Sequence, residues 1–170
     1  MTVIRLDTRS EHGDEPVVTS YSAGLYRGVG VEGPDTRIDQ APEFPRHAPA
    51  PSTEKVEIFI APAHVYTECA HIWNPIHTER RVALAAGLPD IVLHGTATWA
   101  LAAREIIDLF AHRDPLRLRR LAGQFRALVT PGSTITFEGG RRGRSMEFTV
   151  RNSAGAPAIA SGRALIDSAG

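Results

Sequence analysis

The chain has 170 residues, of which 42% are hydrophobic. This length suits one domain, and this composition supplies a core and excludes a disordered chain. The single cysteine, Cys69, excludes an internal disulfide framework and a multi-cysteine zinc site, and it favours a reducing, cytoplasmic location. Neither a membrane-spanning segment nor a signal peptide is expected, because no apolar run approaches the roughly 20 residues that cross a bilayer.

Charge is balanced overall but distributed unevenly along the chain. Residues 1–53 and 54–114 each carry five basic and eight acidic groups, whereas residues 115–170 carry nine and three, for a local excess of +6. The neutral total argues against a nucleic-acid partner. The basic last third is interpreted either as a solvated face or as a docking surface for an anionic ligand or carrier. Its candidate arginines are Arg117, Arg119, Arg120, Arg141, Arg142 and Arg144.

The first third predicts two strands and a long connection. Residues 3–9 and 17–27 have strand character, with a polar turn between them. A proline- and glycine-rich connection without sustained periodicity follows over residues 27–52. We therefore expect one N-terminal segment, residues 1–53, and one main domain, residues 54–170.

The middle of the chain predicts one strand and three helices. Alternation in residues 54–60 predicts a half-buried strand, and residues 63–72 have a short helical pattern. A second short helix is expected over residues 79–86, with Thr78 as its cap. The longest helical pattern covers residues 96–112, where apolar side chains recur along one stripe.

The last third changes from helical to strand periodicity. Apolar and polar residues alternate in three segments separated by turns, residues 124–129, 134–138 and 146–151, and another strand is expected around residues 158–166 after a further turn. Such segments predict an antiparallel meander. A long buried helix followed by a sheet able to curl around it defines an α+β fold.

The densest polar cluster is HIWNPIH, residues 71–77. His77 is a candidate general base, because an unperturbed imidazole titrates near neutral pH. Asn74 can donate and accept hydrogen bonds at once, which suits positioning a water or a substrate oxygen. The alternative is a structural histidine in a helix-terminal loop.

A second cluster, His94-Gly95-Thr96, directly precedes the long helix. A helix start exposes backbone N–H groups without partners, together with the positive end of the helix dipole. Gly95 has no side chain to block a ligand, so its N–H is a candidate donor to a carbonyl oxygen on which charge develops. The alternative is ordinary helix entry, with Gly95 for the turn and Thr96 as the cap.

Together the two clusters resemble the MaoC-like family, also called R-specific enoyl-CoA hydratases or hydratase 2. The family motif reads approximately G-D-x-N-P-[LIV]-H, followed by a segment ending in [IVL]-x-H-G. The matching stretch is ECAHIWNPIHTERRVALAAGLPDIVLHGTATWAL, and PGSTITFEGGRRG and GRALID are similar to the family's closing strands. The resemblance covers about residues 54–167. More loosely, residues 3–30 resemble the trailing strands of an upstream half found in two-domain members.

The resemblance implies a hotdog fold, in which a curved antiparallel sheet wraps a long helix, and a homodimer with a continuous sheet. In such a dimer, residues 3–27 are expected to extend the sheet or cover its rim. The implied ligand is an acyl thioester of coenzyme A or acyl carrier protein, in fatty acid or polyketide metabolism, with no cofactor and no metal. Phosphates of coenzyme A or an acidic carrier then become the expected ligands of the basic last third. The implied reaction adds water reversibly to a trans-2-enoyl thioester and gives an R-3-hydroxyacyl thioester.

Site residues follow from the same resemblance. His77 matches the catalytic histidine, Asn74 the supporting asparagine, and Gly95 the glycine whose backbone binds the thioester oxygen. His94 and Thr96 flank that glycine and are expected to contact substrate.

One motif position differs from the family. The motif aspartate falls on Ile72, and the glycine before it falls on His71. Isoleucine cannot transfer a proton, so Ile72 is expected only in the substrate-binding wall. Glu68, one helical turn earlier on the same face, is the nearest replacement carboxylate; the alternative is a solvated glutamate on the helix surface. His71 is a second candidate.

Three other features receive structural interpretations. Cys69 is expected to be a buried structural cysteine, since nothing near it indicates an activated thiolate. His64, Glu68 and His71 have no distinctive metal-binding spacing. The two tryptophans, Trp73 and Trp99, are expected in the core or in a pocket wall.

Four functions remain open from the sequence. The first is an acyl-thioester hydratase or dehydratase with His77 as base. The second is a catalytically reduced hotdog protein that binds an acyl thioester or supports a partner subunit, which Ile72 favours. The third is a related lyase or isomerase for which one base suffices. A thioesterase is disfavoured, because hotdog thioesterases generally use a carboxylate elsewhere and lack NPIH.

Overall fold

The computed structural model describes residues 2–24, 28–30, 32–34, 43–45 and 53–167. The chain divides into two compact units, Met1–Phe44 and Pro45–Gly170. Most of the connection expected over residues 27–52 lies outside the described residues, as do residues 25–27 of the second expected strand. A domain boundary at residue 53 therefore stays a prediction.

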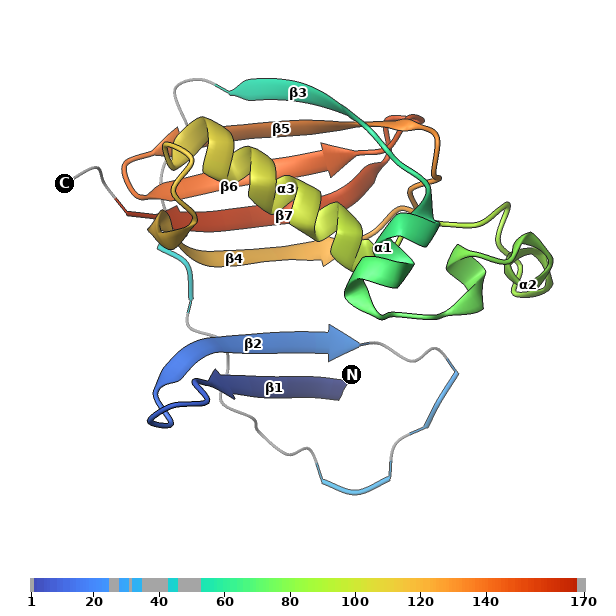
Figure 1. Cartoon of the computed structure of the whole chain (residues 1–170), viewed down its shortest axis with the longest axis horizontal. Helices are drawn as coiled ribbons and strands as arrows, with labels where there is room; N and C mark the ends of the chain where they lie inside the picture. Colours follow the sequence, from blue (N-terminus) through green and yellow to red (C-terminus); the bar gives the residue numbers. More distant parts are fainter. Residues whose placement is uncertain (1, 25–27, 31, 35–42, 46–52, 168–170) are drawn as a thin grey trace. The chain divides into compact units, whose positions relative to one another are not determined.

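The first unit contains an antiparallel hairpin of β1 (Thr2–Arg9) and β2 (Pro16–Gly24), drawn in blue in Figure 1. The two strands form a sheet of their own. A hydrogen bond from the Thr19 hydroxyl to the Asp7 carboxylate, 2.8 Å long, is the main reason that the pKa of Asp7 lies below its ordinary value. The hairpin's larger apolar side chains are exposed: Ile4, Leu6, Val17 and Val18.

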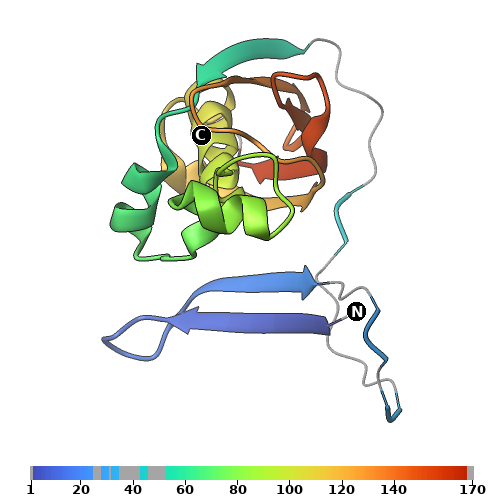
Figure 2. The same cartoon turned by 90° about the vertical axis from the view of Figure 1, so that its right-hand side faces the viewer.

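The second unit is built on a five-stranded antiparallel sheet in the order β3-β5-β6-β7-β4. Its strands are β3 (Glu54–Phe59), β4 (Leu118–Phe125), β5 (Thr134–Arg142), β6 (Ser145–Arg151) and β7 (Pro157–Ile166). The long helix α3 (Gly95–Phe110) lies across one face, and the sheet curves around it (Figures 1 and 2). The expected α+β hotdog architecture is confirmed.

The core lies between α3 and the facing side of the sheet. Alternate residues of the inner strands point toward the helix, and Ile135, Phe137 and Val150 have no exposed surface. Ala102 and Ile106 are equally buried on α3. A small residue such as Ala102 lets the sheet approach the helix closely, while each buried Ile or Phe side chain contributes about 1.5–3 kcal/mol.

Short helices connect β3 to α3, as the sequence predicts. They are α1 (Ala63–Ala70), the 3-10 turn η1 (Pro75–His77) and α2 (Arg80–Ala85). The cap expected for α2 is wrong: Glu79 occupies its N-cap, whereas Thr78 ends η1. Pro75 begins η1 because a first helical residue needs no N–H donor. None of the helices in the described part of the chain is long and apolar enough to cross a membrane.

The strand after α3 differs from its prediction. β4 covers Leu118–Phe125, whereas the alternation in the sequence placed a strand over residues 124–129. As an edge strand, β4 pairs only with β7, and two register shifts interrupt that pairing. Its burial therefore does not alternate, which removes the period-2 signal. Arg126 and Ala127 still donate backbone hydrogen bonds to the start of β7, so the alternation marked the strand's end.

Candidate active site

His77 is fixed at the end of η1 by a short hydrogen bond. The turn begins at Asn74, whose side-chain oxygen accepts from the Ile76 N–H at 3.4 Å. The half-buried His77 ring places Nδ1 2.7 Å from the Val92 carbonyl oxygen. A carbonyl only accepts, so Nδ1 carries the proton in neutral His77. Nε2 then has the free lone pair that a general base requires.

The segment before α3 is attached on both sides. The Val92 N–H donates to the Ile76 carbonyl at 3.4 Å, and the Leu93 N–H donates to the Val129 carbonyl at 2.7 Å. These bonds connect the turn that carries His77 to the start of α3. They place His94 at the N-cap of that helix.

His94 is packed directly against His77. The two imidazole rings stack with centroids 3.6 Å apart and an angle of 24° between their planes. Only 3% of His94 is exposed, and its Nε2 lies 3.2 Å from the Ile72 carbonyl oxygen. Burial lowers the pKa of His94, as the neighbouring charge of His77 also does, while the hydrogen bond to Ile72 acts in the opposite direction. His94 therefore favours the neutral form.

Gly95 opens α3 and is exposed. Within the described residues, no acceptor is seen for the Gly95 and Thr96 amides, so both remain available at the helix start. A Cβ on Gly95 would lie 3.4 Å from the Phe125 ring, so Phe125 borders the approach to this backbone. Thr96 is exposed and is not the cap, because His94 takes that position without a side-chain bond.

Residue 72 is part of the same cluster through its backbone. The Ile72 carbonyl bonds to His94, while 41% of the Ile72 residue is exposed. His71 before it ends α1 in the left-handed conformation, with φ of 54°. This conformation favours glycine, which is the residue that the resemblance places there. The His71 ring stacks on Trp73 and not on His77.

Glu68 bonds to Trp73. It is exposed on α1, and its Oε1 accepts a 3.2 Å hydrogen bond from the Trp73 indole. No hydrogen bond or ion pair joins Glu68 to His77 among the described residues. Trp73 is 62% exposed and therefore lies outside the core, one of the two positions expected for it. The burial expected for Cys69 is wrong, because this residue is exposed. α1 buries residues such as Ala63 and Thr67, and it leaves Cys69 on its exposed face. Trp99 packs against the core as expected.

Arginines of the basic last third gather at the other end of α3. Sixteen residues at about 1.5 Å each put the C-terminal end of this helix about 24 Å from Gly95. There Arg141 donates to the Phe110 carbonyl at 2.5 Å. Arg117 donates to the Asp167 carbonyl at 2.7 Å and to the Ala111 carbonyl at 3.4 Å. Cations that bond to the last carbonyls of a helix also complement its dipole.

Further arginines at this end form ion pairs. Arg119 and Arg144 both bind the Asp167 carboxylate, at 3.3 and 2.5 Å. Burial, together with the nearby charge of Arg117, lowers the pKa of Arg141. The structure thus gives Arg117 and Arg141 a structural role, and it places the arginine cluster away from the helix start that carries Gly95.

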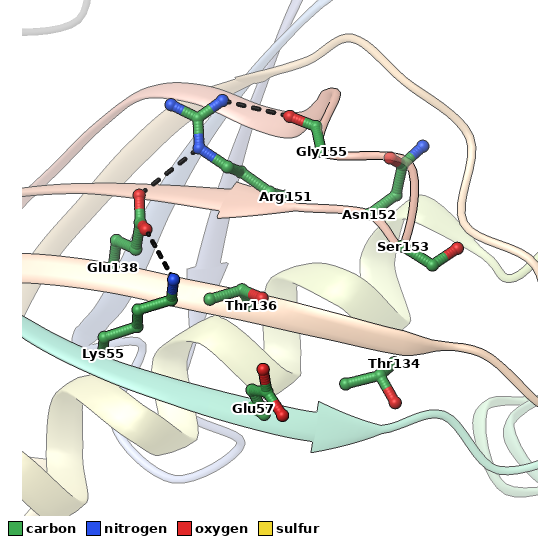
Figure 3. Close-up of a pocket in the computed structure, with 9 residues that line it drawn as sticks. All are labelled: Lys55, Glu57, Thr134, Thr136, Glu138, Arg151, Asn152, Ser153 and Gly155. Atoms are coloured by element: carbon green, nitrogen blue, oxygen red, sulfur yellow. Dashed lines mark hydrogen bonds and ion pairs between the residues drawn. The ribbon is translucent and has the colours of Figure 1, made fainter.

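A polar pocket of about 350 Å³ opens between strands β3, β5 and β6, apart from the histidine cluster. Figure 3 shows Glu138 between two cations, Lys55 at 3.6 Å and Arg151 at 3.3 Å. Arg151 also donates to the Gly155 carbonyl at 3.1 Å. These charges compensate one another across neighbouring strands, as cross-strand pairs on a solvent face do. The pocket therefore provides no alternative catalytic constellation.

Two contributors to the site were not predicted from the sequence. The Val92 carbonyl sets the tautomer of His77, but backbone groups have no residue-type signal. Phe125 was recognised only as a strand residue, because its proximity to Gly95 is a long-range contact. The structure brings His77 against His94, which precedes Gly95 at the start of α3, and it places Asn74 at the N-cap of the turn that carries His77.

Fold and site define a hotdog domain with a histidine beside the start of its central helix. The MaoC like domain family matches residues 36–157. The chain belongs to this family.

Individual relatives support the same assignment. The chain is 24% identical over 139 residues to a probable enoyl-CoA hydratase 2 from Dictyostelium discoideum, covering 81% of this chain and 47% of that protein. It is 27% identical over 121 residues to an enoyl-CoA hydratase from Mycobacterium tuberculosis, covering 71% of this chain and 39% of the relative. The chain thus spans half or less of the length of these relatives. Among solved structures, a MaoC-like dehydratase from Phytophthora capsici superposes with a TM-score of 0.77 at 23% identity, over 93% of this chain and 54% of that one.

Proposed function

We propose that the chain is an acyl-thioester hydro-lyase that interconverts 2-enoyl and 3-hydroxyacyl thioesters of coenzyme A or acyl carrier protein. The observation that carries the proposal is the tautomer of His77. Its Nδ1–H is bound to the Val92 carbonyl, so Nε2 is the basic nitrogen. His77 also stacks on the residue that precedes the free Gly95 amide. Relatives named as enoyl-CoA hydratases support the reaction class.

In this mechanism, His77 Nε2 accepts a proton from water while the water oxygen bonds to C3 of the enoyl thioester. The C2–C3 π electrons move toward the thioester carbonyl, and the Gly95 N–H donates a hydrogen bond to the oxygen that gains charge. The proton on His77 then passes to C2 and completes the addition. The Asn74 amide group supplies a donor for the water. One base performs both transfers, because Ile72 supplies no carboxylate.

Hydration of crotonyl-CoA tests the proposal, with the loss of the enoyl absorbance as the readout. General acid–base catalysis by one group contributes about 10²–10⁴-fold, so His77→Ala should lower kcat by that factor with little change in acyl-CoA binding. His71→Ala is the matched control, because that ring is exposed and stacks on Trp73. An active wild type whose His77→Ala variant is equally active would refute the assignment. Glu68→Gln should have no effect, since its carboxylate faces Trp73.

A second candidate function follows from Ile72, which presents an apolar, partly exposed side chain where the resemblance places an acid. In this case the chain binds acyl thioesters or supports a partner subunit without turnover. Ile72→Asp separates the two functions. An inactive wild type and an active Ile72→Asp variant would favour binding, whereas an active wild type would favour catalysis by His77.

A homodimer with a continuous sheet belongs to the same proposal. Among the strands of the described residues, the edge strands β3 and β4 each pair on one side only, and an unpaired edge favours association. Light scattering should give twice the chain mass at micromolar concentration. A monomer mass would contradict the dimer while leaving the assignment of His77 intact.

A further inference from the structure

His94 contacts three separate parts of the site. Its ring covers His77, its Nε2 bonds to the Ile72 carbonyl, and its own backbone caps the helix whose first residue is Gly95. A Tyr66 ring from α1 lies 5.0 Å away on the same imidazole. Few side chains connect the base, residue 72 and the helix start, and His94 does so while 97% of it is hidden from solvent.

Hydrogen bonding defines the tautomer of His94. The Thr67 hydroxyl donates to the Ala63 carbonyl at 3.1 Å, so its oxygen faces His94 as an acceptor, 3.5 Å from Nε2. The Ile72 carbonyl is a second acceptor for the same nitrogen. Nε2 therefore carries the proton. His94 Nδ1 is buried and has no partner within the described residues.

An imidazole in this state cannot act as the second acid of the site. Protonating Nδ1 would bury a charge without an acceptor, which is costly. Around the ring, the contacting groups from α1, the following turn and η1 are Tyr66, Thr67, the Ile72 carbonyl and His77, and none of these is a carboxylate. His94 thus offers an uncharged stacking face and one donor.

We propose that His94 is a positioning residue that keeps His77 and residue 72 at fixed positions relative to the Gly95 amide. This inference rests on the proposed function, because it assigns His94 a role in presenting that base. Stacking against His94 prevents the His77 ring from rotating away from the orientation in which Nδ1 bonds to the Val92 carbonyl. The Nε2–H bond keeps the turn after α1 against the helix start. His94 does not itself transfer a proton.

Long-range proton–nitrogen NMR correlations on the wild-type protein test the arrangement without an activity assay. Neutral His94 should show the proton on Nε2, and it should become charged only at a lower pH than an ordinary imidazole does. Neutral His77 should show the proton on Nδ1. A proton on Nδ1 of neutral His94, or a His94 that becomes charged at the same pH as an ordinary imidazole or at a higher one, would overturn the proposal.

Two variants separate the ring from the donor. His94→Phe retains a stacking face and loses the donor to Ile72, whereas His94→Gln retains a donor and loses the ring. Each should lower kcat about tenfold to a hundredfold with KM nearly unchanged, since small displacements of a catalytic group are expensive. Thr98→Val is the control: Thr98 is equally buried near the same helix start, and its variant should keep wild-type kcat.

The outcomes distinguish this inference from the proposed function. If both His94 variants keep wild-type kcat in an active enzyme, His94 is a core residue and the positioning role is wrong. If the wild type does not hydrate enoyl thioesters, the function fails, and the His77 Nδ1–H signal still tests positioning. That signal should exchange faster with water in His94→Gln than in Thr98→Val; equal protection would refute the proposal.

Discussion

Replacing Arg141 with methionine removes a guanidinium that joins the end of α3 to the end of β7. Its Nη1 donates to the Phe110 carbonyl at 2.5 Å, and its Nε donates to the Gly143 carbonyl at 2.6 Å. Longer contacts reach the carbonyls of Ile166 and Asp167 at 3.5 and 3.3 Å. Methionine keeps most of the apolar stem, so the variant isolates the loss of these hydrogen bonds.

The expected loss follows from which carbonyls water can reach. A hydrogen bond from a charged donor contributes about 1.5–3 kcal/mol. The Gly143 carbonyl is in an exposed turn and regains a partner from water, so its bond adds little. The Phe110 carbonyl is part-buried and does not regain one as easily. Relief of the repulsion from Arg117 offsets part of the loss. We expect Arg141→Met to lower the free energy of unfolding by about 2 kcal/mol.

Urea denaturation at fixed pH measures this difference. Arg126→Met is the matched control, because its guanidinium is exposed and bonds to the Gln124 side chain. The control should change stability by no more than about 0.5 kcal/mol. KM for an acyl thioester should be unchanged in Arg141→Met. A stable Arg141→Met variant with a raised KM would refute the structural role and restore a ligand-binding one.

Two further predictions concern packing and pH. Gly162→Ala should destabilise the fold by about 1–3 kcal/mol, because the added Cβ would lie 2.5 Å from the Phe148 carbonyl oxygen; Gly139→Ala should cost less, since its closest clash is with the mobile end of Met146. Urea unfolding of both variants checks the order, and equal losses would contradict it. The lowered pKa of His94 means that the unfolded chain binds its proton more readily, so stability from this group is complete above about pH 6.5 and declines as pH falls. One titrating group changes the free energy of unfolding by at most about 1.4 kcal/mol per pH unit. The His94→Phe variant lacks this group, so its free energy of unfolding should fall less between pH 7 and pH 5 than that of the wild type. An identical fall in both proteins would contradict the prediction.

Predictions from the sequence succeeded where one physical signal dominated a segment. The apolar stripe predicted α3 to within a residue or two, because burial against a sheet imposes helical periodicity. The alternation in residues 146–151 predicted β6, whose alternate residues are buried. For β4 the same signal failed, since an edge strand with register shifts has no uniform face.

The candidate site was predictable in composition but not in orientation. The NPIH and HG motifs identified His77 and His94 as candidate site residues through the family resemblance, and the structure stacks their rings with centroids 3.6 Å apart. The orientation of the Glu68 side chain was not predictable, because its position on a short helix does not indicate that the Trp73 indole will bond to it. α1 ends at His71 in the left-handed conformation, and the Trp73 indole two residues later donates to the Glu68 carboxylate.

Residue 72 separates what the fold requires from what the chemistry requires. The fold uses its carbonyl, which accepts the hydrogen bond from His94, and every residue type supplies a carbonyl. Its side chain is 41% exposed and belongs to no core cluster among the described residues. Exchange of an acid for isoleucine therefore leaves the histidine cluster assembled, and with it the His77 tautomer and the open helix start. Ile72→Asp is for this reason a clean test: it adds a carboxylate that can accept or donate a proton in the site, while the backbone contact that positions residue 72 is unchanged.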